Sequence, residues 1–382
     1  MDYNKESLVL HEKLKGKLEV CSKVKLDSIE NLSLAYTPGV AEVCKEISKD
    51  KKNVYKYTIK KDTVAVISDG SAVLGLGNIG AEASLPVMEG KAILFKEFAG
   101  INAFPICLNN QDIKKTIETI KNISPVFGGI NLEDFKAPEC FEIEEALQDL
   151  GIPVMHDDQH GTAVVVLSGL INAFKLKPEL KKEETKVIIN GCGAAGIAIA
   201  KMLLKYGLKN ILILDSKGII CRQRTDLNKS KKEIANLTNL RNFSGDLSIA
   251  LKNADIFIGV SKANLLNEDL IKSMNKNPII FALANPNPEI MPDKAKNAGA
   301  MIVATGRSDF PNQINNVLAF PGIFKGALEI NAKRITNKMK LAAAIAIANT
   351  IKNPTPENII PSPLDKSIVE AVSEAVKNAY KE

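Results

Sequence analysis

The segment that most constrains the fold is a glycine-rich turn that directly follows an apolar run. The run at 186–190 reads KVIIN, the turn at 191–196 reads GCGAAG, and the helix former IAIAKMLLKY comes next. In such a strand–turn–helix unit the first glycine permits a tight turn, the second lets the backbone approach a pyrophosphate, and the third lets the helix pack on the strand. We therefore predict a dinucleotide site formed by the six residues of the turn: Gly191, Cys192, Gly193, Ala194, Ala195 and Gly196.

The end of the next predicted strand bears on the choice between NAD and NADP. Asp215 ends the run ILILD, roughly 20 residues after the turn, where a carboxylate can bind the ribose hydroxyls of NAD. Three cations follow closely and would attract the additional phosphate of NADP: Lys217, Arg222 and Arg224. We expect NAD as the cofactor and NADP as the alternative. A glycine turn with an empty or degenerate site is the structural alternative to both.

Short β-branched runs alternate with amphipathic runs through both halves of the chain, which is typical of α/β proteins with parallel sheets. In the first half, a strand at 63–67 and a helix at 79–98 begin the series. In the second half the spacing predicts a doubly wound sheet. Its strands are expected at 186–190, 211–215, 255–260, 278–283 and 300–305. From about residue 322 the chain is predicted to be helical, with a Pro-rich break at 353–363.

A chain of 382 residues exceeds the size of most single cores, so two domains are expected. The apolar helical pattern at 162–174 leads into a charged segment at 175–185, which we interpret as a solvated connection. The boundary is placed near residue 160. Residues 1–160 are predicted to form an α/β domain that binds substrate and metal, and residues 161–382 a Rossmann-type dinucleotide domain with C-terminal helices.

Composition and charge exclude several classes of function. The net charge is +6 and the lysines are interspersed with glutamates, so the chain carries no nucleic-acid footprint. The longest apolar runs are far shorter than the roughly 20 residues that span a bilayer, so no membrane role is expected. The six cysteines form no CxxC pair and follow no secretory segment, which favours a reduced, cytoplasmic compartment. With only three histidines, any metal is expected to be bound by oxygen.

Two acidic pairs follow predicted strands in the first half of the chain. Glu133-Asp134 stands in GGINLEDF, and Asp157-Asp158 stands in IPVMHDDQHGTA. Because the carboxyl ends of parallel strands face the crevice in which such sheets bind ligands, both pairs are expected there. Together they can supply three hard oxygen ligands, which suits Mg²⁺ or Mn²⁺. One acidic pair alone is more often a solvated turn or a helix cap, but two pairs at matched positions favour a metal site.

Lys91 and Tyr36 are polar residues whose sequence patterns alone do not assign a role. Lys91 lies in the predicted helix among apolar neighbours, so it is either a surface charge or a partly buried base with a lowered pKa. Tyr36 comes just before Thr37-Pro38, where we expect a helix to start with the proline in the first helical position. Tyrosines before helices mostly pack their rings and make local hydrogen bonds.

Taken together, these segments closely resemble the malic enzyme family, in the right order and through nearly the whole chain. The matching segments are LAYTPGVAEV, GLGNIG followed by GK, LEDF, HDDQHGTA, ALANPNPE and INNVLAFPG. The length resembles the short bacterial type. The resemblance implies a homodimer that converts (S)-malate to pyruvate and CO₂ with NAD or NADP and with Mg²⁺ or Mn²⁺, and that also decarboxylates oxaloacetate.

The resemblance further implies roles for individual residues. Three carboxylates would hold the metal: Glu133, Asp134 and Asp158. Lys91 would contact malate and act as the general base, and Tyr36 would be the general acid. Asn285 and Asn315 would contact malate, and Asn285 would also contact the cofactor.

One position departs from the larger eukaryotic members of the family. They carry an arginine for the substrate carboxylate just before the LGLG segment, whereas Ser71-Ala72 stand there in this chain. We expect that carboxylate to be bound instead by the metal, by Asn285 or Asn315, or by a residue of a partner subunit.

Three alternatives to a malic enzyme are considered. A malolactic-type enzyme of the same family would keep its cofactor bound and release lactate. A non-catalytic NAD-sensing module would have no use for the base, the acid and the metal ligands together. An amino-acid dehydrogenase with the same domain order would have no use for the metal carboxylates.

Overall fold

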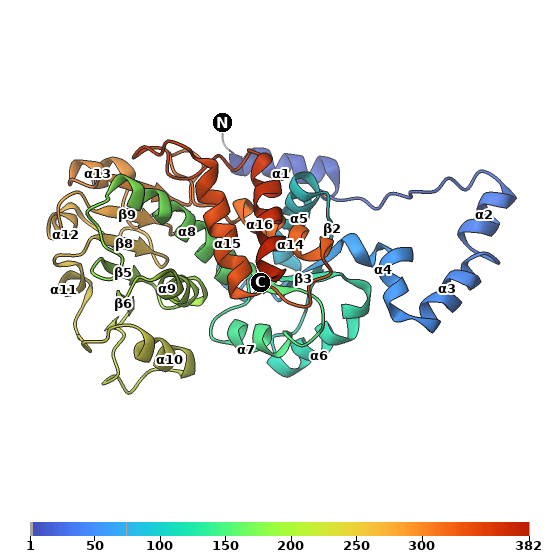
Figure 1. The fold of residues 1–382 in the computed structure, drawn as a ribbon, viewed down its shortest axis with the longest axis horizontal. Coiled ribbons are helices and arrows are strands. Elements are labelled where there is room, and N and C mark those ends of the chain that lie inside the picture. The colour runs from blue at the N-terminus through green and yellow to red at the C-terminus, as the bar shows by residue number, and fades with distance from the viewer. Residues whose placement is uncertain (1–2, 74, 382) are drawn as a thin grey trace.

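The structure, a computed structural model, describes residues 3–73 and 75–381 and contains two mainly parallel sheets side by side (Figure 1). The first sheet has the order β2-β1-β3-β4, and all of its strands are parallel. Its strands are β1 (Thr63–Ser68), β2 (Asn102–Cys107), β3 (Gly129–Leu132) and β4 (Val154–His156). The predicted α/β class with parallel sheets is confirmed.

Helices cover both faces of the first sheet, which explains why the central strand is apolar throughout. Val64 and Val66 of β1 belong to the same core as α5 (Gly80–Ala99), whereas Ala65 and Ile67 face a core on the other side. That second core includes residues of α6 (Ile113–Ile123) and α7 (Glu139–Ala146). A strand that is buried on both faces has no polar alternation, so TVAVI could be predicted from its composition.

The second sheet has six strands in the order β10-β9-β8-β5-β6-β7. The predicted strands are confirmed as β5 (Lys186–Asn190), β6 (Asn210–Asp215), β8 (Ile256–Gly259), β9 (Ile279–Ala282) and β10 (Ile302–Thr305). The order reverses after β5, which is the switch point at which doubly wound sheets bind ligands. The short antiparallel strand β7 (Gly218–Ile219) was not predicted. Helices accompany this sheet as α9 (Ala194–Tyr206), α10 (Lys229–Leu237), α11 (Leu247–Leu251), α12 (Glu268–Lys272) and α13 (Pro292–Asn297).

The two sheets are joined by the buried helix α8 (Asp157–Leu176), so the predicted boundary near residue 160 falls inside a helix. The chain ends in η4 (Asn316–Leu318), α14 (Phe320–Glu329), α15 (Asn337–Thr350) and α16 (Ser367–Lys381). These helices lie between the two sheets in Figure 1. The ring of Phe95 in α5 meets those of Phe320 and Phe324 edge-on, at centroid distances of 4.7 and 5.4 Å, so the end of the chain packs on the first sheet's helices.

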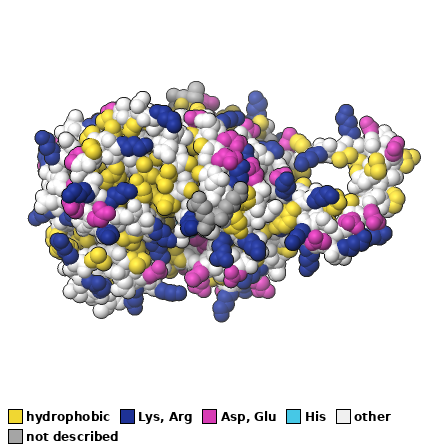
Figure 2. Space-filling view, in the orientation of Figure 1, with side chains coloured by type: hydrophobic (Ala, Val, Ile, Leu, Met, Phe, Trp, Pro, Cys, Tyr) yellow, Lys and Arg dark blue, Asp and Glu magenta, His cyan; other side chains and the backbone are white. Residues whose placement is uncertain are grey.

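The N-terminal arm, residues 18–50, extends away from the rest of the molecule (Figure 1). It contains α2 (Ile29–Ala35) and α3 (Val40–Lys49), and neither helix has a buried residue. The predicted helix start at Pro38 is wrong, because α3 begins at Val40 after Gly39. Apolar side chains are nevertheless exposed on the arm (Figure 2), among them Val20, Ile29 and Leu34.

The remaining short elements precede the first sheet: α1 (Tyr3–Leu14), η1 (Lys51–Asn53), α4 (Val54–Tyr57) and η2 (Ile59–Asp62). Another short turn, η3 (Ser124–Val126), leads into β3. Within the described part of the chain, no helix has both the length and the apolar character needed to cross a membrane.

Candidate active site

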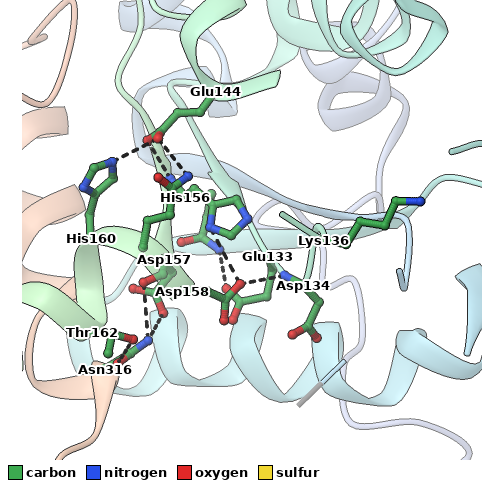
Figure 3. A network of polar contacts seen from close by, with 12 residues as sticks. Glu133, Asp134, Lys136, Glu144, His156, Asp157, Asp158, His160, Thr162 and Asn316 are labelled. Atoms are coloured by element: carbon green, nitrogen blue, oxygen red, sulfur yellow. Dashed lines mark hydrogen bonds and ion pairs between the residues drawn. The ribbon is translucent and has the colours of Figure 1, made fainter. Parts of the chain in front are cut away.

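The two acidic pairs meet at the carboxyl ends of β3 and β4. Leu132 and His156 are paired across these strands, so the residues that follow them leave the sheet side by side. Glu133 and Asp134 continue from β3, whereas Asp158 lies in the first turn of α8. Ligand atoms of these three carboxylates lie within 4.8 Å of one another (Figure 3). The structure thus brings the three predicted metal ligands together.

The arrangement of these carboxylates fits a divalent cation. The Asp134 Oδ2 atom is buried without a hydrogen-bond partner. Burial, reinforced by the charge of Asp158, raises the pKa of Asp134 to about 8, and burial also raises the pKa of Glu133. If all of these carboxyl groups were ionised, their negative charge would exceed the single positive charge of Lys91, and a divalent cation could balance it. Oxygen donors in such a setting suit Mg²⁺ or Mn²⁺.

Lys91 extends from α5 into the acidic cluster and is itself almost fully enclosed. Its Nζ atom lies 2.6 Å from Asp157 Oδ2, 2.9 Å from Glu133 Oε1 and 4.4 Å from the centre of the Phe320 ring. Burial lowers the pKa of Lys91, but the charges of Asp157 and Glu133 outweigh that effect and leave the pKa raised. The expected burial of Lys91 and its lowering effect on the pKa are present, but the two carboxylates, which the expectation did not include, reverse the net direction.

Asp157 is a site residue that sequence reasoning did not assign, although its acidic pair was noticed. Besides Lys91, its Oδ2 atom accepts a hydrogen bond of 3.1 Å from the Asn316 amide. Thr162 donates in turn to the Asn316 side-chain oxygen at 3.1 Å. The predicted Asn315 uses its own side-chain oxygen to accept from the Val317 amide at 3.0 Å. Of the two asparagines, Asn316 is the one that reaches the cluster.

Asn285 lies on the loop after β9, and that loop touches the first half of the chain. A Cβ built on Gly75 would lie 3.1 Å from the Asn285 backbone oxygen. A Cβ built on Gly306 would lie 2.7 Å from the Asn285 side-chain nitrogen. Asn285 is therefore at the junction of the two halves, where a residue can contact ligands held by either.

Ser71 and Ala72 stand at the position of the missing arginine, and both bind the backbone of the segment that follows β3. Ser71 Oγ accepts a hydrogen bond from the Lys136 amide, and the Ala72 amide donates one to the Asp134 carbonyl.

The glycine turn between β5 and α9 has the close backbone approaches that its sequence requires. Gly191 has a φ of 128°, and a Cβ there would lie 2.7 Å from the Val260 carbonyl oxygen. A Cβ on Gly196 would lie 1.7 Å from the Gly191 oxygen, so no side chain fits. Nothing lies within 4 Å of a Cβ on Gly193, which leaves open space beside the N-terminus of α9. An open helix N-terminus of this kind can accept a pyrophosphate.

Asp215 ends β6 as predicted and is surrounded by cations. Arg224 donates to its two oxygens at 2.8 and 3.0 Å, and the Lys231 ammonium lies 2.6 Å away. Burial raises the pKa of Asp215, but these hydrogen bonds outweigh it and hold the pKa at about 2. Lys217 instead pairs with Asp226 at 3.0 Å. Lys231, which sequence reasoning missed, comes from α10, and no local pattern connects it to the strand end.

Tyr36 does not join this cluster within the chain. It caps the C-terminus of α2 on the N-terminal arm, and 67% of the residue is exposed. Figure 1 shows α2 at the far end of the arm, well separated from α5, which carries Lys91. The structure therefore brings Lys91 and the carboxylates together but leaves Tyr36 outside.

Comparisons with known proteins give consistent matches over both halves. The family model described as malic enzyme, N-terminal domain, matches residues 15–148, and that described as malic enzyme, NAD binding domain, matches residues 159–380. The chain is 54% identical to a bifunctional malic/malolactic enzyme of Bacillus subtilis, over 100% of this chain and 94% of that protein. It is 53% identical to an NAD-dependent malic enzyme of Geobacillus stearothermophilus, over 95% of this chain and 76% of that protein. A crystal structure of an NAD-dependent malic enzyme from Thermotoga maritima superposes with a TM-score of 0.94 at 54% identity, covering 97% of this chain and 98% of that one.

Proposed function

This chain belongs to the malic enzyme family, and we propose that it oxidises and decarboxylates (S)-malate to pyruvate and CO₂, using NAD in preference to NADP and a divalent cation. The observation that carries the proposal is the contact of Lys91 with Asp157 beside three convergent carboxylates. A buried lysine in reach of a metal site can exchange a proton with a ligand of that metal. The same site would decarboxylate oxaloacetate supplied from outside.

The residues of the chain divide the work of the reaction between them. Lys91, in its amine form, would take the proton of the malate hydroxyl and return it to the same oxygen after CO₂ is lost, while Asp157 and Glu133 hold the Lys91 side chain in place. Asn316 fixes Asp157 from the other half of the chain. The turn at 191–196 would hold the dinucleotide, which would supply oxidation of the C2 alcohol, and Glu133, Asp134 and Asp158 would hold a cation, which would supply polarisation of the carbonyl for loss of CO₂. We propose that Asn285 and Asn315 contact malate.

We further propose a homodimer in which each N-terminal arm supplies Tyr36 to the partner's site as the general acid. Two observations support this arrangement. The arm exposes apolar side chains, 87% of Val20 and 83% of Ile29, which a second copy of the chain would cover. Tyr36 itself is exposed and lies away from the Lys91 of its own chain. In this dimer, the hydroxyl of the partner's Tyr36 would donate a proton to C3 of the product enol, while Lys91 takes the enol O–H proton.

A malolactic activity is the second candidate, because one relative with 54% identity is a bifunctional malic/malolactic enzyme. In that reaction the same site would return the reducing equivalents to pyruvate and release lactate. The substitution of an arginine by Ser71-Ala72 bears equally on both reactions, since malate enters both.

One assay separates the candidates. Purified protein is mixed with L-malate, Mn²⁺ and either NAD or NADP, with and without a chelator, while reduced cofactor, pyruvate and lactate are measured. Chelator-sensitive formation of reduced cofactor and pyruvate in equal amounts is the expected result. Lactate without net reduction would favour the malolactic candidate, and no product with either cofactor would contradict both and favour a non-catalytic NAD-binding protein.

A further inference from the structure

A second buried charged cluster lies behind the acidic segment, on the side away from the three metal ligands (Figure 3). Its centre is Glu144 of α7. The Glu144 Oε1 atom accepts a hydrogen bond of 3.0 Å from the His156 backbone amide. Its Oε2 atom accepts one of 3.1 Å from the Gln159 side chain and lies 2.9 Å from His160 Nε2. Three contacts to residues 156–160 thus come from one carboxylate.

Lys340 extends this cluster to the C-terminal helices. It lies on α15, only 7% of it is exposed, and its Nζ atom lies 3.1 Å from His160 Nδ1. A neutral His160 can accept from Lys340 at Nδ1 and donate to Glu144 at Nε2, which makes one continuous chain of hydrogen bonds. Burial raises the pKa of Glu144, but His160 and Lys340 outweigh it and hold the pKa at about 2, so the carboxylate is charged.

The contacts of Glu144 fall where β4 turns into α8. His156 is the residue that precedes α8, and its side chain makes no capping hydrogen bond. Glu144 holds the backbone of that residue from behind, and its negative charge lies near the N-terminus of the helix, where it is favourable. On the front of the same turn, Asp157 pairs with Lys91, and Asp158 accepts from the Asp134 amide at 2.8 Å. Residues 156–160 are therefore clamped between the two clusters.

We infer that Glu144 and Lys340 are positioning residues that hold Asp158 in its metal-binding orientation through His160 and the His156 backbone. Neither side chain is among the metal ligands or the proposed acid and base. Partners of this kind orient ligands, and their loss typically costs about 10- to 100-fold in metal affinity or activity. The inference rests on the proposed metal site, and it adds that α15, from the end of the chain, controls the affinity of that site.

A cavity gives experimental access to this cluster. It has a volume of about 1300 Å³ and is lined by residues of α7, α8, α9 and α15, including Glu144, His160 and Lys340. Truncation of Lys340 to alanine would leave room for a small alkylammonium ion in place of the lost ammonium group. Lys201 of α9 lines the same cavity but pairs with Glu233 at 2.7 Å, near the surface, which makes it a matched control.

The test measures Mn²⁺ binding directly, by the loss of the electron paramagnetic resonance signal of free Mn²⁺, so that it does not depend on turnover. Lys340→Ala is expected to raise the Kd for Mn²⁺ about tenfold or more, while Lys201→Ala stays within about twofold of the wild type. Ethylammonium chloride is expected to restore much of the affinity of Lys340→Ala, whereas potassium chloride at the same concentration is not. NADH binding, followed by fluorescence, is expected to change in neither variant.

Two further variants keep the test decisive if the alanine variant does not fold. Lys340→Met retains the length of the side chain without its charge and is expected to bind Mn²⁺ as weakly as Lys340→Ala, and Glu144→Gln is expected to do the same. An unchanged Kd for Mn²⁺ in folded Lys340→Met and Glu144→Gln would overturn the inference. Equal weakening of Mn²⁺ and NADH binding would also overturn it, as a general structural effect. Absence of Mn²⁺ binding in the wild type would contradict the proposed metal site itself.

Discussion

The Lys91 ammonium lies 2.6 Å from the Asp157 carboxylate, at the point where α5 of the first sheet meets the N-terminus of α8. This contact, together with Glu133, keeps the lysine charged although it is buried. A cation bound by the neighbouring carboxylates would lower the pKa of Lys91 again, because a like charge disfavours the ammonium form. In the proposed reaction, a filled metal site would therefore favour the neutral form of Lys91 that can act as a base.

The first prediction concerns Asp158, a proposed metal ligand. Asp158→Asn keeps the shape of the side chain but removes its charge, so the Mn²⁺ concentration that gives half-maximal malate oxidation is expected to rise at least about tenfold. Asp112→Asn alters an exposed carboxylate that caps α6 and serves as the control. Titration of both variants with Mn²⁺ under saturating malate checks the prediction. An unchanged metal requirement would remove Asp158 from the ligand set.

The second prediction is a pH dependence of stability in the absence of divalent cations. The pKa of Asp134 is raised to about 8 in the folded protein, whereas an unfolded aspartate has a pKa of about 3.9. Between these values the folded state holds a proton that the unfolded state releases, so the contribution of Asp134 to the free energy of unfolding is fully present below about pH 4 and is lost as the pH rises towards 8. Thermal unfolding in a chelator should show a lower Tm at pH 8 than at pH 6.

Asp134→Asn provides the control for this effect. It removes the titrating group, so the decline of Tm between pH 6 and pH 8 is expected to become shallower, with Glu133 causing what remains. Mn²⁺ is expected to raise the Tm of the wild type more at pH 8 than at pH 6, because at the lower pH it must displace protons from its ligands. A Tm that is independent of pH in the wild type would contradict the assignment of Asp134 as a buried, uncompensated carboxylate.

Much of the fold could be predicted because its signals are local. The strand TVAVI is buried on both faces, so its continuous apolar run alone predicts a buried strand. The GCGAAG turn requires glycine for a local steric reason, because a Cβ on Gly196 would collide with the Gly191 oxygen. The two acidic pairs could be placed together because parallel strands end at the same edge of a sheet. In each case the pattern that allowed the prediction lies within one strand and the turn that follows it.

The features that were missed depend on contacts between distant segments. Lys340 and His160 are 180 residues apart, and nothing in either sequence pattern pairs them. Asn316 reaches Asp157 because η4 turns its side chain towards α8, whereas the adjacent Asn315 caps η4 itself. The position of Tyr36 follows from an arm that has no core of its own, so no pattern of burial within one chain could place it.

The third prediction tests whether Tyr36 acts in the partner's site. Lys91→Ala is expected to lose malate oxidation by about 10²- to 10⁴-fold, as expected for loss of a general base. Tyr36→Phe should lose overall turnover but retain more of the reduction of oxaloacetate. If the two variants are unfolded, mixed and refolded, or are co-expressed, each mixed dimer has one site with both residues intact. Random pairing then gives about a quarter of the wild-type activity from two inactive parents.

The control for this complementation is a mixture of Tyr36→Phe with wild-type chains, which shows that mixing itself does not harm activity. If Tyr36 acts within its own chain, every site of the mixed dimer lacks one residue and the mixture stays as inactive as its parents. Recovery of activity would therefore identify the arm as a part of the neighbouring site, and its absence would return Tyr36 to its own chain.

The fourth prediction concerns the choice of cofactor at Asp215. This carboxylate holds Arg224 at 2.8 Å and Lys231 at 2.6 Å, so both cations lie at the end of β6 but are engaged by Asp215. Asp215→Ser removes the repulsion of a ribose phosphate and releases both cations to bind it. The ratio of kcat/KM for NADP to that for NAD is expected to rise about tenfold or more, which corresponds to about 1.4 kcal/mol. Asp226→Ser removes a partner of Arg224 and of Lys217 but leaves Asp215 in place, so it should change the ratio much less. A fall in the ratio for Asp215→Ser would show that the ribose of the cofactor is not held at the end of β6.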